Sequence, residues 1–351
     1  MKRIPISSDR EYEVVIDIPF QKEVERIAAG RARVAIFFSE SMQHAIPQFA
    51  ANDAEFFYFP IPDGESGKSI QTLHQSWNWL GAAGFTRSDL LVAIGGGAVT
   101  DFSGFVASTW LRGIDWVAVP TTVAGMVDAS IGGKTGINSD YGKNLIGSFY
   151  SPIEVVIDPD WLQTLSDRDF AAGLAEVIKC GFIKDQRILE LFKSKSLADI
   201  RSSRDTTIEL IERAVLVKAA IVSADFKESY DREVLNYGHT FGHAIELLSN
   251  YSLRHGECVA IGMSYVAHLS NRLNLISDDL LDEHLLLLRS IGLPTTFADS
   301  QWPEIYAAMK LDKKSRGNSL RFVVLTGIGK TQRLENPKES DLIDAYEKVC
   351  Q

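Results

Sequence analysis

Short apolar runs alternate with segments of helical periodicity in the first half of the chain. Five runs that are rich in β-branched and aromatic residues indicate buried strands, at residues 33–38, 56–59, 90–94, 116–119 and 155–157. Residues 69–80 and 101–111, which lie between these runs, carry apolar positions at helical spacing. Such alternation predicts a mainly parallel sheet that binds ligands at the carboxyl ends of its strands.

The pattern changes after about residue 165. Ser166 is followed three positions later by an acidic residue, which is typical of a helix N-cap. From there on we expect helices at residues 170–183, 205–223, 234–248, 257–273 and 278–291. A strand pair follows, at residues 320–325 and after Gly327. The sequence therefore predicts an α/β domain with a mainly parallel sheet over residues 1–165 and an all-helical domain over residues 166–351.

The composition narrows the class of protein. A chain of 351 residues is long enough for two domains, and 45% hydrophobic with 23% charged residues is typical of soluble globular proteins. No apolar run approaches the roughly 20 residues that span a bilayer, and the first residues lack the apolar segment of a secretory signal. Three scattered cysteines without a CxxC pair favour the cytoplasm. A net charge of −10 argues against nucleic acid as a partner.

Two histidines four residues apart form the most informative motif of the chain. His239 and His243 lie on one face of an expected helix, and Gly238 and Gly242 beside them would leave room for a metal ion or a substrate. The spacing alone predicts that both histidines are metal ligands, as in other zinc-binding helices.

A third histidine and a glutamate in separate segments complete the candidate metal site. His255 follows in an RHGE segment, and Glu176 lies three residues before Lys179 in an apolar helix. Catalytic zinc sites usually have three protein ligands of these types and one open position. The alternative is a cluster that only packs helices together. The remaining histidines, at positions 44, 74, 268 and 284, have no such context and are expected to be surface or core residues.

A glycine triplet, Gly95–Gly97, directly follows one expected strand. Glycines at a strand-to-helix turn let backbone N–H groups approach a pyrophosphate, although the spacing here is not GxGxxG. We expect the next helix to begin near Asp101, with Thr100 as its cap. Nucleotide binding and a simple tight turn are both compatible with this motif. The same holds for the segment 63–68, which is either a charged loop or a source of contacts to ribose and phosphate.

Several basic residues stand beside Gly, Asn or His within apolar segments, although the net charge is negative. They are Arg112, Lys134, Lys143, Lys179, Lys218, Arg232, Lys313 and Lys314. The segment around Lys134 resembles a P-loop, but no glycine lies five residues before Gly133, so we do not expect a nucleotide-binding P-loop here. The basic residues instead predict a positive pocket for a small anion that carries both phosphate and carboxylate.

Ten motifs, in order and at matching spacing, make the chain resemble the 3-dehydroquinate synthase family from Asp63 to about Leu325. They are DGESGK, GGGAVTDFSGF, RG, VPTT, DASIGGKTGIN, GKNLIGSFY, GLAEVIK, DREVLNYGHTFGHAIE, RHGE and MKLDKK. The resemblance implies an N-terminal α/β domain that binds NAD and a C-terminal helical domain that binds a metal and the substrate. It also implies an active site between them, zinc or cobalt as the metal, and a homodimer in the cytoplasm.

The resemblance also implies roles for residues at matching positions. Glu176, His239 and His255 become the metal ligands, which moves His243 to the substrate pocket. The implied NAD contacts are Asp63, Glu65, Lys68, Gly96, Gly97, Asp101, Thr121, Thr122, Lys134, Lys143, Trp161 and Thr164. The implied phosphate contacts are Lys134, Asn144, Asn236, His243, one of Lys313 and Lys314, and Arg112 from the partner subunit. Lys218 and Arg232 match the carboxylate site, and Asp128 and Lys179 match positions near the ring hydroxyls.

The implied reaction converts 3-deoxy-D-arabino-heptulosonate 7-phosphate to 3-dehydroquinate and phosphate in the shikimate pathway. It proceeds by transient oxidation with NAD, phosphate elimination, reduction and intramolecular aldol closure. The alternatives are a sibling cyclase acting on a neutral sugar phosphate, a metal-dependent alcohol dehydrogenase and a non-catalytic nucleotide-binding protein. Lys218 and Arg232, together with Asn236 and His243, favour a substrate that carries a carboxylate.

Overall fold

The chain forms two compact units. The computed structural model describes residues 1–51, 53–227, 231–298, 301–313 and 320–350, with side chains left undescribed at 311–313. The first unit comprises Met1–Thr164 and Lys218–Lys227, and the second comprises Leu165–Val217 and Glu228–Gln351. Each unit has its own buried apolar core.

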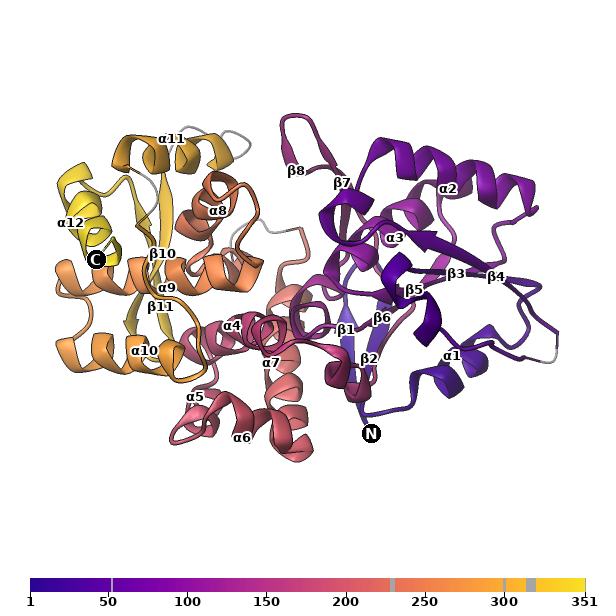
Figure 1. Ribbon diagram of the computed structural model, residues 1–351, viewed down its shortest axis with the longest axis horizontal. Helices are drawn as coiled ribbons and strands as arrows, with labels where there is room; N and C mark the ends of the chain where they lie inside the picture. The colour runs from indigo at the N-terminus through magenta and orange to yellow at the C-terminus, as the bar shows by residue number, and fades with distance from the viewer. Residues whose placement is uncertain (52, 228–230, 299–300, 314–319, 351) are drawn as a thin grey trace. The chain divides into compact units, whose positions relative to one another are not determined.

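A seven-stranded sheet forms the centre of the first unit (Figure 1). Its strand order is β1-β2-β9-β6-β5-β3-β4, and every neighbouring pair is parallel except β1 and β2. The strands are β1 (Lys2–Ser7), β2 (Glu11–Ile16), β3 (Arg33–Ser39), β4 (Glu55–Ile61), β5 (Leu90–Gly95), β6 (Asp115–Pro120) and β9 (Glu154–Ile157). The predicted mainly parallel sheet is confirmed, and the β1–β2 hairpin adds an antiparallel edge to it.

Helices and a second hairpin complete the first unit. The helices are α1 (Phe20–Ala28), α2 (Ile70–Ala82) and α3 (Gly97–Thr109), with short helical turns η1 (Glu40–Ala45), η2 (Gly64–Gly67), η3 (Trp110–Arg112), η4 (Gly125–Ala129) and η5 (Pro159–Thr164). Strands β7 (Lys134–Ser139) and β8 (Gly142–Phe149) pair antiparallel. The segment that resembles a P-loop in the sequence is therefore a turn that leads into a β-hairpin.

The second unit is mainly helical, as predicted. Its elements are α4 (Asp167–Ile183), α5 (Gln186–Phe192), α6 (Leu197–Ser202), α7 (Arg204–Ala224, whose end belongs to the first unit), η6 (Asp231–Asn236), α8 (His239–Leu248), α9 (His255–Arg272), α10 (Asp278–Ser290), α11 (Trp302–Lys313) and α12 (Glu339–Val349). The expected strand pair is the antiparallel hairpin β10 (Arg321–Gly327) and β11 (Lys330–Glu335). Helix α9 is central, because it packs against α4, α8, α10, α12 and β10 (Figure 1).

Glycines set the distance between α9 and its neighbours. A Cβ atom at Gly262 would lie 1.9 Å from the carbonyl oxygen of Gly238, at the start of α8. A Cβ atom at Gly256 would lie 1.7 Å from the carbonyl oxygen of Ala172 in α4. Carbon and oxygen atoms that are not bonded cannot approach so closely, so only glycine permits these backbone contacts. The start of α8 is thereby held against α9 at Gly262, and the first turn of α9 is held against α4.

The expectation that Gly238 and Gly242 leave room for a metal ion is wrong. A Cβ atom at Gly242 would lie 2.8 Å from the carbonyl oxygen of Cys258, and one at Gly238 would lie 2.8 Å from Met263. The backbone and side chains of α9 therefore occupy the space beside both glycines. Their small size serves the packing of two helices, which a sequence pattern within α8 does not show.

Residues 218–227 group with the first unit, which the sequence-based division into 1–165 and 166–351 did not show. The Lys218 ammonium lies 2.5 Å from a carboxylate oxygen of Asp128, and the Ser223 hydroxyl accepts a hydrogen bond of 3.1 Å from the Ser7 amide. The Phe226 ring also packs edge-on against Phe149, with ring centroids 5.3 Å apart. These contacts depend on residues far away in sequence, so helical periodicity does not reveal them.

Candidate functional site

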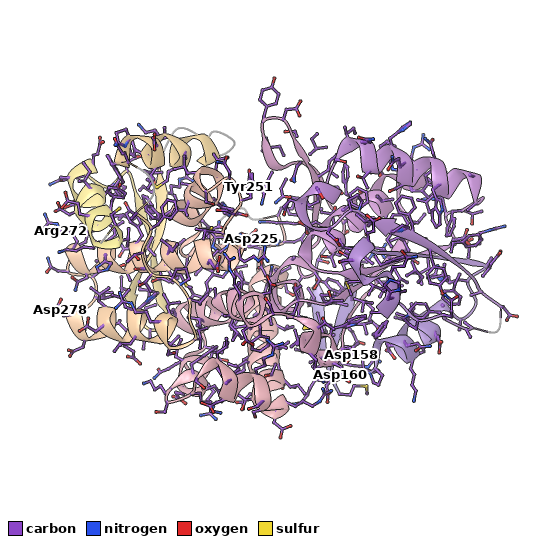
Figure 2. All side chains as sticks on the ribbon, in the orientation of Figure 1. Asp158, Asp160, Asp225, Tyr251, Arg272 and Asp278 are labelled. Atoms are coloured by element: carbon purple, nitrogen blue, oxygen red, sulfur yellow. The ribbon has the colours of Figure 1, made fainter. Side chains whose placement is uncertain are left out.

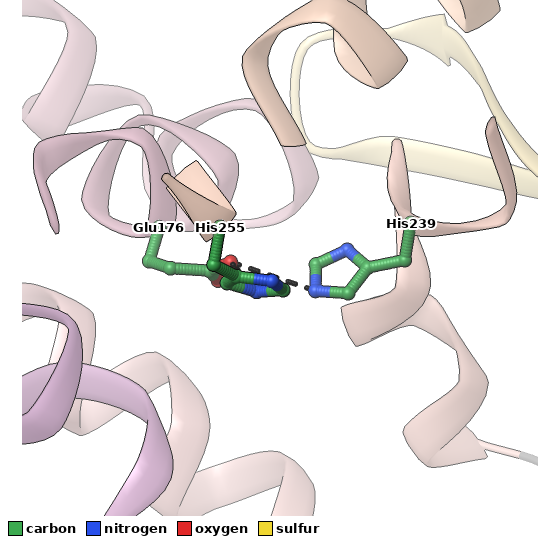
Figure 3. Close-up of side chains that lie close together, drawn as sticks. All are labelled: Glu176, His239 and His255. Carbon is green, nitrogen blue, oxygen red and sulfur yellow. Dashed lines mark ion pairs between the residues drawn. The ribbon is translucent and has the colours of Figure 1, made fainter. Parts of the chain in front are cut away.

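Three side chains from different helices of the second unit form a candidate metal centre. Glu176 lies in α4, His239 is the first residue of α8 and His255 is the first residue of α9. The Nε2 atoms of both histidines lie 3.5 Å from Oε1 of Glu176 (Figure 3). One ligand atom of each residue lies within 4.8 Å of the others. Two imidazoles and a carboxylate at this separation fit a zinc-type ion with an open fourth position.

The second nitrogen of each histidine is held by the protein. Nδ1 of His239 lies 3.1 Å from the carbonyl oxygen of Tyr237, and Nδ1 of His255 lies 3.2 Å from Oε2 of Glu246. Donation from Nδ1 to these oxygens fixes the orientation of each ring, so that each Nε2 atom faces Glu176. Sequence reasoning did not single out Tyr237 or Glu246. The signal for Glu246 is that it lies seven residues after His239, on the same helix face.

The charges around the cluster give the two histidines opposite protonation states. Glu176 forms a buried ion pair with Lys179, one turn further along α4. Burial, and then the Lys179 charge, lower the pKa of His239 to about 3. Burial alone would also lower the pKa of His255, but hydrogen bonds to Glu176 and Glu246 raise it to about 10. Without a metal ion, His239 is therefore neutral and His255 is protonated at neutral pH.

Metal binding at about pH 8 is expected to release about one proton, because a metal ligand must be a neutral imidazole. The proton comes from His255, whose pKa is raised to about 10, and not from His239. The affinity should therefore rise by about tenfold per pH unit and level off as pH passes the pKa of His255. Calorimetric titration of metal-free protein with Zn²⁺ in buffers of different ionisation enthalpy measures the number of protons. A binding enthalpy that is the same in every buffer would contradict this assignment.

His243 lies one turn after His239 in α8. Its ring centroid is 5.3 Å from that of His239 and 5.9 Å from that of His255. His243 also forms a second group of possible ligands with Glu246 and His255. The structure thus brings all three sequence-predicted histidines together with Glu176.

Two of the other candidate residues of the second unit, Arg232 and Asn236, lie close to the cluster in sequence. Both belong to η6, and Arg232 is only 2% exposed. Lys314 lies outside the described residues, and so does the side chain of Lys313.

The glycine triplet of the first unit forms a tight turn between β5 and α3. Gly95 ends β5, Gly96 is the N-cap residue and α3 begins at Gly97. A Cβ atom at Gly97 would lie 2.9 Å from Cβ of Ala129, so the turn packs closely against the segment after β6. Thr121, which begins that segment, donates its amide to the carbonyl oxygen of Gly95 at 2.9 Å.

The expectation that Thr100 caps α3 is wrong, because α3 begins three residues earlier. Thr100 lies inside the first turn, where its hydroxyl donates a hydrogen bond of 3.0 Å to the carbonyl oxygen of Gly97. Glycine has no side chain and therefore adds no apolar position to a helical pattern. The sequence for this reason does not show that the helix already begins at Gly97. The implied cofactor residue Thr122 caps a different turn, since its hydroxyl accepts a 3.1 Å hydrogen bond from the Gly125 amide.

Motifs that are far apart in sequence converge on Lys68. Its side chain is only 2% exposed. The ammonium group lies 2.7 Å from Oδ2 of Asp101 in α3 and also contacts the side-chain oxygen of Asn144 in β8. Burial raises the pKa of the Asp101 carboxyl, against the lowering effect of the Lys68 charge. Three of the implied NAD and substrate residues thus form one polar cluster.

A second set of contacts extends this polar cluster. The Glu65 carboxylate accepts a 2.8 Å hydrogen bond from the Asn138 side chain and lies 3.7 Å from the Lys143 ammonium. The Asp63 carboxylate accepts a 2.7 Å hydrogen bond from the Ser41 hydroxyl. The segment 63–68 is therefore built into the unit beside the β7–β8 hairpin, and it is more than a charged surface loop.

The remaining candidates of the first unit lie in several places. Lys134 is exposed at the start of β7, and Arg112 is exposed at the end of η3 with a positive φ of 66°. Lys218 is 6% exposed, and its ammonium group also contacts the backbone oxygen of Asp128 at 2.5 Å. These two residues form an ion pair, as noted above.

The turn of η5 is held by contacts of its own. The Trp161 ring packs against Phe20, with ring centroids 5.0 Å apart, and the Thr164 hydroxyl donates to the Trp161 carbonyl oxygen at 2.7 Å. Asp158 precedes the turn and Asp160 lies within it (Figure 2). One carboxylate oxygen of Asp158 accepts a 3.0 Å hydrogen bond from the Phe20 amide. These contacts give Trp161 and Thr164 structural roles, while their contact with NAD is a prediction.

Among the described residues, no helix has both the length and the apolar character that crossing a bilayer requires.

The first unit has a mainly parallel sheet with a glycine-rich turn, and the second is helical and carries a carboxylate–histidine cluster. Together these features define a class of two-unit proteins with a candidate metal centre. The family model described as 3-dehydroquinate synthase N-terminal matches residues 58–172, and the one described as 3-dehydroquinate synthase C-terminal matches residues 173–315. A 3-dehydroquinate synthase of Corynebacterium efficiens is 45% identical over 99% of this chain and 97% of its own length. The chain belongs to the 3-dehydroquinate synthase family.

Two solved structures of sugar cyclases are similar over nearly the whole chain. A 2-deoxy-scyllo-inosose synthase complexed with carbaglucose-6-phosphate, NAD⁺ and Co²⁺ is 26% identical, with a TM-score of 0.87 and 99% of both chains covered. A 2-epi-5-epi-valiolone synthase from Streptomyces hygroscopicus subsp. jinggangensis 5008 with NAD⁺ and Zn²⁺ bound is 25% identical, with a TM-score of 0.89 and 99% of both chains covered. The likeness agrees with the α/β and helical parts predicted from the sequence.

Proposed function

We propose that the chain is a 3-dehydroquinate synthase, which converts 3-deoxy-D-arabino-heptulosonate 7-phosphate to 3-dehydroquinate and phosphate. The observation that carries this proposal is 45% identity to a synthase of that name over 99% of the chain. The Glu176, His239 and His255 cluster supports it, because the reaction requires a group that activates a substrate hydroxyl. The reaction belongs to the shikimate pathway of aromatic amino acid biosynthesis.

We assign two cofactors, NAD and a Zn²⁺ or Co²⁺ ion. The solved relatives contain NAD⁺ with one of these ions, and Glu176, His239 and His255 offer ligands of the right types. When bound, the ion would polarise a substrate hydroxyl, and NAD would accept a hydride and later return it. We prefer this ligand set to the one that contains His243 and Glu246, because Glu246 already holds Nδ1 of His255. Glu176 is also only 1% exposed.

NAD is assigned to the polar cluster and the glycine turn of the first unit. Lys68 and Asp101 hold each other in place, and their positions beside the Gly96–Gly97 turn suit a lysine near phosphate. The further proposed contacts are Asp63, Glu65, Thr121, Thr122, Lys134, Lys143, Trp161 and Thr164.

Each unit offers cationic and amide side chains that we assign to parts of the substrate. In the second unit, we assign the phosphate to Asn236 and His243, the carboxylate to Arg232, and a ring hydroxyl to Lys179. In the first unit, Asn144 and Lys134 would serve the phosphate, Lys218 the carboxylate and Asp128 a ring hydroxyl. Lys313, Lys314 and Arg112 are further candidates for the phosphate. Several hydrogen bonds would hold the leaving phosphate in a fixed position. One of its oxygens could then act as the base that accepts the proton of the neighbouring C–H group.

A turnover assay tests the function directly. Purified protein receives the heptulosonate phosphate, NAD and Zn²⁺, and the release of phosphate and the formation of the cyclic product are followed together. We expect equal amounts of both, no accumulation of NADH, and loss of activity after chelation. Phosphate release from sedoheptulose 7-phosphate or glucose 6-phosphate alone would make the protein a sibling cyclase. Accumulation of NADH with simple alcohols would make it a dehydrogenase.

We further propose that the chain forms a homodimer through the β7–β8 hairpin. Among the described residues, β8 is paired only with β7, and it carries Leu145 (58% exposed), Ile146 (43%) and Phe149 (41%). An exposed apolar edge strand is a surface that proteins normally cover.

We also propose a location in the cytoplasm, where the small anionic substrate is found. The buried thiols of Cys180 and Cys258 fit this location. The net charge of −10 speaks against nucleic acid as a partner.

Replacing Leu145 with glutamate is expected to shift the protein from dimer to monomer, because the substitution places a charge within the apolar surface of β8. Size-exclusion chromatography with light scattering measures the mass. Leu286, which is 65% exposed on α10 of the second unit, is a matched control, and Leu286→Glu should remain a dimer. A wild-type monomer, or equal masses for both variants, would reject the proposed interface.

A further inference from the structure

A fully buried histidine lies outside the metal cluster. His284 in α10 has no exposed surface, and its Nε2 atom lies 2.9 Å from the hydroxyl oxygen of Tyr237, which is equally buried. Burial of polar groups is costly, and a hydrogen bond between them offsets the cost only if the geometry is kept. Burial also lowers the pKa of His284 to about 3, so its ring is neutral at neutral pH.

Tyr237 connects this buried pair to the metal cluster. Its backbone oxygen lies 3.1 Å from Nδ1 of His239 and is the acceptor that directs Nε2 of His239 towards Glu176. The next residue, Gly238, has a φ of 80° and begins the turn into α8. The orientation of the Tyr237 peptide therefore sets the orientation of the His239 ring.

His284 also contacts the helix that carries Glu176. Its ring stacks on Phe182 of α4, with ring centroids 3.9 Å apart and an angle of 16° between the planes. Phe182 lies six residues after Glu176 in the same helix. One side chain from α10 thus touches both segments that supply Glu176 and His239. The sequence alone predicts only a surface or core residue at position 284.

We propose that Tyr237 and His284 are positioning residues of the metal centre. The hydrogen bond between their side chains fixes the Tyr237 peptide, and the carbonyl group of this peptide holds the Nδ1–H group of His239. Both residues act through His239 and have no contact with the ion in this role. The inference rests on the proposed function, because it requires His239 to be a metal ligand. Partners of this kind typically change metal affinity by about 10–100-fold.

Tyr237→Phe removes the buried hydroxyl and keeps the ring. Tyr265→Phe is the matched control, because Tyr265 is also fully buried in the second unit and its hydroxyl donates to the Leu342 carbonyl oxygen at 3.2 Å. Metal-free proteins are titrated with Co²⁺ in competition with a chelating dye, and the visible spectrum of bound Co²⁺ and the Tm are recorded. We expect similar losses of Tm in the two variants. Only Tyr237→Phe should bind Co²⁺ about tenfold more weakly, with a changed spectrum.

His284→Phe and the double variant Tyr237→Phe/His284→Phe separate positioning from general packing. If Tyr237 and His284 act only through their shared hydrogen bond, the effects of the two substitutions are not additive. The double variant should then weaken Co²⁺ binding no more than either single variant does. Equal Co²⁺ affinities and spectra for Tyr237→Phe, Tyr265→Phe and wild type would overturn the inference while the metal site stands. If His239→Ala binds Co²⁺ with the same affinity as wild type, the proposed ligand set is wrong, and the inference fails with it.

Discussion

Replacing His239 with alanine is expected to abolish metal binding and turnover together. His239 supplies one of three candidate ligands, and its Nε2 atom lies 3.5 Å from the Glu176 carboxylate. Substitution of a residue that only supports a metal ligand lowers metal affinity or activity by about 10–100-fold. Loss of a ligand itself should lower both by more than that. Metal content after dialysis and the phosphate-release assay measure the two losses.

His268→Ala is the control for this substitution. His268 lies in α9 of the same unit but belongs to neither of the two candidate ligand groups. The control should keep its metal and most of its turnover. Full activity and unchanged metal content in His239→Ala would show that the ligand assignment is wrong.

Replacing Gly262 with alanine is expected to give the largest loss of stability. The added Cβ atom would lie 1.9 Å from the Gly238 carbonyl oxygen, and a backbone oxygen cannot rotate away as a side chain can. Overpacking of a core usually costs about 1–3 kcal/mol and occasionally more, and we expect the upper end or beyond here. The start of α8, which carries His239, must move away from α9 at this point, so metal affinity should fall as well. Unfolding in urea and Zn²⁺ titration measure the two effects.

Gly81→Ala is the matched control, because Gly81 also lies within a helix. There the added Cβ atom would meet only the Trp110 side chain, at 3.4 Å, which is the lower limit of an ordinary van der Waals contact. Alanine favours helices over glycine by about 0.5–1 kcal/mol, so this variant should be neutral or slightly more stable. Equal stability of the two variants would contradict the close helix packing.

Buried parallel strands could be predicted because they form continuous apolar runs. Residues 90–94 and 116–119 correspond closely to β5 and β6 for this reason. The β1–β2 hairpin is not predicted, because Glu11 and Glu13 interrupt the continuous apolar run that identifies the other strands, and each strand has only six residues. Spacing within α8 correctly brought His239 and His243 to one place.

Features that depend on contacts between distant segments could not be predicted from local patterns. The spacing predicts room for a ligand beside Gly238 and Gly242, but α9 fills that space. Which of the histidines are ligands is also a tertiary question, because it depends on Glu176 in another helix and on the acceptors at Tyr237 and Glu246. The resemblance to a family supplied the ligand set that the spacing alone did not.

The three candidate ligands are widely separated in sequence, yet all belong to one unit. The ion would therefore bind the folded second unit and not its unfolded chain, so binding stabilises that unit by mass action. At a free ion concentration about 100 times the dissociation constant, this stabilisation is about 2.7 kcal/mol. No candidate ligand of this cluster comes from the first unit. Depletion of the ion should thus loosen the helical unit selectively, which makes metal supply a determinant of how long the protein survives proteolysis as well as of its activity.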